Sequence, residues 1–182
     1  RADDVIIVFD ASEDLSDQDI RIAGYVHEQG KPSVIAINKW DLVSKDDKTI
    51  NFYKQRLNSE LKFMDYYLPV FISAKTGQRL NTIMPAVIKA YQNSTKKTST
   101  SILNEILQDA VAISQPPSKY GKRLKFYFIS QTGVTPPTFT IQANDSTLVH
   151  FSYQRYLENA LRRNIDLSGT PIKIEFKDKK GE

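Results

Sequence analysis

The chain has 182 residues, of which 40% are hydrophobic and 25% are charged, which is enough for one large or two small domains with their own cores. It contains no cysteine, which excludes disulfide bonds and thiolate metal sites and favours a reducing, cytoplasmic setting. No apolar run approaches the roughly 18–20 residues that a membrane-spanning helix needs, so we expect no membrane partner. The net charge of +4 is uneven, because residues 94–182 hold 13 basic and 8 acidic side chains. This excess suggests an RNA partner, although a solvated lysine-rich surface gives the same count.

The first half of the chain alternates buried strands with helices. The strands are the apolar, β-branched runs VIIVF, SVIAI and LPVFIS. Between the first two, Ser16 can cap a helix that ends at Gly30. Two further helices are expected over residues 47–64 and 78–94, the last with a bend near Pro85. The β-α-β-α-β-α order predicts a parallel sheet with right-handed crossovers.

The second half has a different order of expected helices and strands. A polar stretch over residues 93–101 is typical of a linker. It is followed by a helix, a loop, two strands, a helix and a strand, over residues 101–114, 115–123, 124–130, 138–145, 152–167 and 170–178. We therefore predict an α/β domain over residues 1–95 and an α+β domain, in the order α-β-β-α-β, over residues 96–182.

Polar side chains follow the second and third strands of the first half. The two clusters are Asn38, Lys39, Trp40 and Asp41, and Ser73, Ala74 and Lys75. In an open parallel sheet, ligands bind at the carboxyl ends of the strands, so these clusters mark the expected site. Trp40 is expected to pack in the core instead of touching a ligand.

The residue types in these clusters suit guanine. A carboxylate at Asp41 can accept two parallel hydrogen bonds from the N–H edge that guanine offers and adenine does not. Asn38 can bond the base edge or tie the two loops together, and the backbone N–H of Ala74 can donate to guanine O6. The methylene stems of Lys39 and Lys75 can lie against the base faces. The alternative is a polar loop whose Asp41 caps the next helix.

These motifs resemble those of a known family. NKWD and SAK resemble the two guanine-specificity motifs of the Ras-like P-loop GTPases. Residues 1–31 are similar to the second GTPase domain of the bacterial double-GTPase family Der, also called EngA, and residues 136–176 resemble the KH-like C-terminal domain of that family. The resemblance implies GTP or GDP as ligand, with Mg²⁺ in the intact protein. It also implies a role in assembly of the large ribosomal subunit, with that subunit or its rRNA as partner.

The phosphate-binding motif of such GTPases is missing from the chain. No G-x-x-x-x-G-K-[ST] string occurs, and the D-x-x-G at Asp166 to Gly169 falls in the second half, where it indicates a turn. We therefore expect a partial GTPase domain with no catalytic residue and no metal ligand, which does not hydrolyse GTP alone. The resemblance implies that the phosphate loop and a first GTPase domain precede this chain, and that the latter is a further partner.

The basic half lacks the GXXG loop with which RNA-binding KH domains clamp a nucleic-acid backbone. Candidate contacts to ribosomal RNA phosphates or to a neighbouring GTPase domain are Lys119, Lys122, Arg123, Arg155, Arg162 and Arg163. Ordinary solvated charge is the alternative for each of them. A second hypothesis for the whole chain is a non-enzymatic RNA- or ribosome-binding module whose nucleotide half serves only as a scaffold.

Overall fold

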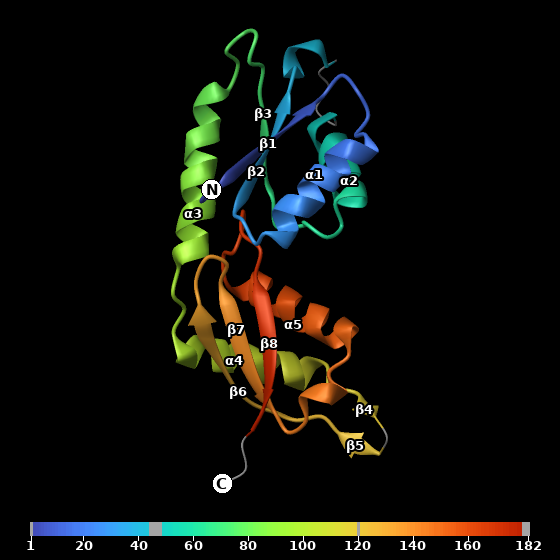
Figure 1. Ribbon diagram of the computed structural model, residues 1–182, viewed down its shortest axis with the longest axis vertical. Helices are drawn as coiled ribbons and strands as arrows, with labels where there is room; N and C mark the ends of the chain where they lie inside the picture. The colour runs from blue at the N-terminus through green and yellow to red at the C-terminus, as the bar shows by residue number, and fades with distance from the viewer. Residues whose placement is uncertain (1, 44–48, 120, 180–182) are drawn as a thin grey trace. The chain divides into compact units, whose positions relative to one another are not determined.

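The structure is a computed structural model that describes residues 2–43, 49–119 and 121–179. The chain divides into two compact units. The first comprises Arg1–Ser94 together with Leu167–Pro171, and the second comprises Thr95–Asp166 together with Ile172–Glu182. Each unit has its own sheet and helices (Figure 1).

The first unit contains the predicted parallel sheet. Strands β1 (Val5–Asp10), β2 (Ser33–Asn38) and β3 (Leu68–Phe71) lie in that order and all pair in parallel. The helices are α1 (Asp17–Glu28), α2 (Thr49–Glu60) and α3 (Ile83–Thr95). The β-α-β-α-β-α order is therefore confirmed.

Local signals explain where these helices begin and end. Ser16 caps α1 as predicted, through a reciprocal capping box with Asp19. Helix α2 ends at Glu60, earlier than expected, and tighter turns follow it. Pro85 lies in the first turn of α3, where a proline removes no hydrogen bond within the helix.

Helices cover the two faces of this sheet unequally. On one face, Ile7, Ile35 and Phe71 pack with side chains of α1 and α2. On the other face, a cluster of Val34, Ala36, Val70 and Ile72 packs against Ala90 of α3. Strand β1 pairs only with β2 among the described strands, and Ile6 and Val8 on its α3-side face are exposed.

The second unit follows the predicted order α-β-β-α-β. It consists of α4 (Thr100–Ile113), β6 (Phe126–Gly133), β7 (Thr138–Ala143), α5 (Phe151–Asn164) and β8 (Lys173–Asp178). Strand β7 is central, antiparallel to β6 and parallel to β8. The predicted loop over residues 115–123 contains an additional short hairpin, β4 (Ser118–Lys119) and β5 (Lys122–Arg123).

The segment Leu167–Pro171 packs in the first unit although it follows α5 in the chain. The backbone N–H of Gly169 donates to the Tyr66 carbonyl at 2.6 Å, and its carbonyl accepts from the Ser33 N–H at 2.7 Å. The amide of Asn93 donates to the Ser168 carbonyl at 2.8 Å. The predicted turn over residues 166–169 is present, but the expected strand begins only at Lys173, because the residues before it bond to the first unit.

Candidate guanine-binding site

The two predicted clusters meet at the carboxyl edge of the parallel sheet. Asn38 is the last residue of β2 and lies in register with Asp10, the last residue of β1. Its side-chain Oδ1 accepts a hydrogen bond from the backbone N–H of Ala74 at 2.9 Å. Of the two roles open to Asn38, the structure therefore shows the one in which it ties the two loops together.

The chain between Asn38 and Asp41 is anchored by Trp40. Its backbone N–H donates to the Ile72 carbonyl at 3.0 Å, and its side chain is only 2% exposed. The indole packs against Phe71 and Tyr53, with ring centroids 4.5 and 5.1 Å away. The prediction that Trp40 packs in the core is confirmed. This anchor holds the loop at the strand ends while Lys39 stays exposed and Asp41 is half-buried.

Lys39 pairs with a residue that sequence reasoning missed. Its ammonium group forms an ion pair with Asp10, and the other carboxylate oxygen of Asp10 accepts from the Ser12 N–H and Oγ at 2.9 and 2.6 Å. Hydrogen bonds from Lys39 first and from Ser12 second lower the pKa of Asp10 to about 2, and the bond with Asp10 raises the pKa of Lys39. Both groups thus stay charged at neutral pH. The sequence does contain a hint of this pair, because Asp10 ends the strand that precedes β2 and parallel strands end at the same edge of the sheet.

The second loop is shaped by Ser73. Its side chain is buried, its Oγ accepts from the Thr76 N–H at 3.2 Å, and its own N–H donates to the Gln78 carbonyl at 3.0 Å. Ala74 and Lys75 are exposed beside it. Because the Ala74 N–H already donates to Asn38, a guanine O6 would share this donor in a three-centre bond.

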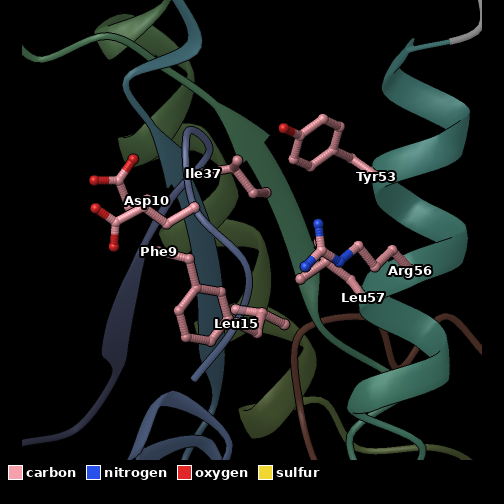
Figure 2. A pocket seen from close by; sticks show the side chains of 8 residues that line it. Phe9, Asp10, Leu15, Ile37, Tyr53, Arg56 and Leu57 are labelled. Carbon is pink, nitrogen blue, oxygen red and sulfur yellow. The ribbon is translucent and has the colours of Figure 1, made fainter. Parts of the chain in front are cut away.

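A small, mainly apolar pocket lies between the β1 end of the sheet and α2. Figure 2 shows Phe9, Leu15 and Ile37 on one side and Tyr53 and Leu57 of α2 on the other. Its charged residues are Asp10, Glu13 and Arg56. The two polar loops predicted from the sequence are not part of this lining, which shares only the neighbouring Asp10 with the strand ends.

The structure does not gather the predicted basic contacts into one cluster on one element. Lys119, Lys122 and Arg123 lie on the β4–β5 hairpin, and Arg155, Arg162 and Arg163 lie on α5. Arg162 is the most enclosed of the α5 group, with a 14% exposed side chain that pairs with Glu158 at 3.1 Å.

Two searches of the described residues gave negative results. Among the described residues, no group of three or more histidine and acidic side chains is placed to hold a metal ion. In the same part of the chain, no helix is long and apolar enough to cross a membrane.

Each of the two units matches a known protein family. Residues 1–93 match the family described as elongation factor Tu GTP binding domain, and residues 97–177 match the family described as KH-domain-like of EngA bacterial GTPase enzymes, C-terminal. The fold and these matches thus define the class: a parallel α/β domain of the GTP-binding-domain family, followed by a KH-like domain.

The relatives narrow the class to one family. The chain is 50% identical to GTPase Der of Clostridium kluyveri and 47% identical to GTPase Der of Lachnoclostridium phytofermentans, in each case over 180 residues. These matches cover 99% of the chain and 41% of each relative, so the chain spans about two-fifths of their length. The chain belongs to the Der (EngA) family of bacterial GTPases.

A solved structure resembles the chain more distantly. The crystal structure of an Aquifex aeolicus Era variant bound to GDP and AlF4− is 16% identical, with a TM-score of 0.43 over 98% of this chain and 65% of that one.

Proposed function

We propose that the first unit supplies the guanine-recognition half of a GTP-binding site. The observation that carries the proposal is the 2.9 Å hydrogen bond between Asn38 and Ala74, which joins the NKWD and SAK loops at one edge of the sheet. Ligands of open α/β sheets bind at that edge. The side chains of both loops can therefore act on the same base.

Each residue has a distinct role in this proposal. The carboxylate of Asp41 accepts from N1–H and the 2-amino group of guanine, and the Ala74 N–H donates to O6. The exposed stems of Lys39 and Lys75 lie against the base faces. Ser73 and Asn38 shape and join the loops. Adenine would leave these polar groups unpaired, a mismatch that costs a binding site several orders of magnitude in affinity.

GTP hydrolysis is proposed for the whole protein and not for this chain alone. The curated relatives are more than twice as long, and the chain contains no phosphate-binding motif. Among the described strands β1 pairs only with β2, and its Ile6 and Val8 are exposed, which suits pairing with a further strand and cover by a further helix. We propose that the residues for phosphate and Mg²⁺ lie in that additional sequence, so that this chain alone shows no GTP turnover.

The second unit is proposed to contact ribosomal RNA of the large subunit in the cytoplasm. Its excess of basic residues and its membership of the KH-like family support an RNA partner. The scaffold-only alternative predicts that changes at Asp41 leave nucleotide binding untouched.

The test of guanine recognition is Asp41→Asn in a protein extended to the length of the relatives. The amide can no longer accept both guanine N–H groups, so affinity for GDP should fall at least about 100-fold while that for xanthosine diphosphate rises. Asp65→Asn, at an exposed carboxylate outside the site, is the matched control. Unchanged preference for GDP in the Asp41 variant would refute the assigned role.

A further inference from the structure

The KH-like sheet has one face that the helices of its own unit do not cover. Ile129 of β6 and Ile141 of β7 line a small apolar pocket with residues of both α4 and α5, which places both helices on that side of the sheet. Figure 1 shows α4 passing behind the strands. Side chains alternate along a strand, so the neighbours Phe128, Thr140 and Gln142 belong to the opposite, open face.

Strand register builds a row of distinct chemical groups across this open face. Phe128 pairs with Gln142, and Gln142 pairs with Lys177 of β8. The row thus runs from an aromatic ring through an amide to an ammonium group. Neighbouring strands are about 4.8 Å apart, so it spans about 10 Å.

The aromatic end of this row is exposed. Phe128 and its neighbour Tyr127 are 40% and 49% exposed, although large apolar side chains are normally withdrawn from water. Tyr127 lies at a register shift of β6 between Phe126 and Phe128, so alternation does not assign its face. Its contact with Lys179 places it with the open face. The ammonium group of Lys179 lies 5.2 Å from the centre of the Tyr127 ring, as in a cation–π contact. Planar surface and positive charge thus lie together at this end of the sheet.

The middle of the open face consists of small hydroxyl side chains. Ser130 pairs with Thr140 across the strands, and Thr140 pairs with Glu175. The hydroxyl groups of Thr132 and Thr140 lie 2.9 Å apart and hydrogen bond to each other. Thr140 is only 7% exposed, so the surface offered to a base consists of the exposed Phe128 and Gln142 and not of these hydroxyl groups.

The charges along β8 favour an anionic ligand. Lys173, Lys177 and Lys179 are exposed, whereas Glu175 is the one acidic side chain that alternation places with them between residues 173 and 179. Lysine is depleted at the centres of protein–protein interfaces, which are more apolar than this face. Exposed aromatics beside cations are instead the pattern with which proteins bind single strands, by stacking bases and neutralising phosphates.

We propose that this open face, defined by Tyr127, Phe128, Gln142, Lys177 and Lys179, binds single-stranded nucleic acid. Phe128 and Tyr127 stack on unpaired bases, Gln142 bonds a base edge, and the two lysines contact phosphates. The proposal rests on the RNA-binding part of the proposed function and names its surface. It places the contact away from the hairpin and α5 basic residues that sequence reasoning selected.

The test measures binding of a fluorescent, unstructured RNA of about 12 nucleotides, and of DNA of the same sequence, to the full chain by anisotropy. Phe128→Ala should weaken binding about tenfold, equivalent to about 1.4 kcal/mol, without changing the salt dependence. Lys177→Ala should instead reduce the slope of log K against log salt concentration by about 0.7. Equal binding of the RNA and DNA strands, or a preference for RNA, each supports the assignment.

Matched controls lie elsewhere on the chain. Phe151→Ala removes another exposed aromatic of the same unit, and Lys54→Ala removes an exposed cation of α2 in the first unit; neither should change affinity or slope. Lys122→Ala tests the rival contact on the β4–β5 hairpin. Circular dichroism verifies the fold of each variant, and Phe128→Leu keeps apolar bulk at that position in case the alanine variant unfolds. Loss of affinity in the Phe151 or Lys122 variant, but not at Phe128 and Lys177, overturns this surface and leaves RNA binding intact.

Failure of both oligonucleotides to bind overturns the inference and the RNA part of the proposed function together. Guanine binding is measured separately by the Asp41 variant and is unaffected by that result. If neither strand binds and the open face becomes protected from hydrogen exchange only in the longer protein, its occupant is protein and the inference is wrong.

Discussion

Gly169 is the residue whose substitution most directly tests how the segment Leu167–Pro171 joins the first unit. Its φ of +80° lies in the region that favours glycine. A Cβ at this position would lie 2.6 Å from the Cβ of Ala90, 2.9 Å from its Cα, and 2.9 Å from Cδ1 of Leu68. Because Ala90 Cα is backbone, the clash cannot be relieved by a side-chain rotation.

Two costs add for Gly169→Ala. The left-handed backbone costs a non-glycine residue about 1–2 kcal/mol. Overpacking against Ala90 and Leu68 costs about 1–3 kcal/mol. The free energy of unfolding of the first unit should therefore fall by about 2–5 kcal/mol.

Gly77 provides a matched control for the backbone term. Its φ is +79°, but no atom lies within 4 Å of where its Cβ would be. Gly77→Ala should thus cost only the conformational part, and the difference of about 1–3 kcal/mol isolates the steric clash.

The assay is urea denaturation followed by fluorescence of Trp40, the only tryptophan of the chain and a buried residue of the first unit. Equal unfolding midpoints for the Gly169 and Gly77 variants would refute the reasoning, because the two positions differ chiefly in the space around the added methyl group. A Gly169 variant as stable as the unaltered chain would mean that the segment does not pack as described.

Two predictions concern the strand-end loops and are best made in the longer protein. Asn38→Ala removes the acceptor for the Ala74 N–H. Dissociation of a fluorescent GDP analogue should become about fivefold to tenfold faster, as expected for one lost hydrogen bond of about 1–1.5 kcal/mol. An unchanged rate would show that this hydrogen bond is dispensable for nucleotide binding. Asp10→Asn releases Lys39 and should also speed dissociation, with recovery in Asp10→Glu; no recovery would indicate a structural defect instead. The pKa of Asp10 is lowered to about 2, so its contribution to stability is present above its ordinary pKa of 3.8 and is lost as the pH falls from about 4 through about 2. Acid titration of stability should lose this component in Asp10→Asn.

Much of the fold follows from local patterns in the sequence. Buried β-branched runs separated by helices predict a parallel sheet, and the structure confirms it. The same holds for the α-β-β-α-β order of the second half, because hydrophobic periodicity and turn residues act over short distances. The hairpin of β4 and β5 was not predicted, because strands of two residues are too short to show an alternation of apolar and polar side chains.

The candidate residues can be read from the sequence, whereas the hydrogen bonds and ion pair that hold them cannot. The polar strand ends at Asn38 and Ser73 are visible in the sequence because parallel strands place their carboxyl ends at one edge. The ion pair of Lys39 with Asp10 depends on side-chain geometry between loops 29 positions apart, which no local pattern specifies. Trp40 could be assigned to the core because a large aromatic side chain is usually buried, and it is 2% exposed in the structure.

By itself, the sequence determined the two structural classes, the order of their elements and the residue types available for guanine. The tertiary structure alone decided that Asn38 bonds to Ala74, that Asp10 holds Lys39, and that Gly169 packs in the unit that precedes it in the chain. The physical reason is range: helix caps and strand periodicity act within a few residues, whereas these contacts join positions that only folding brings together.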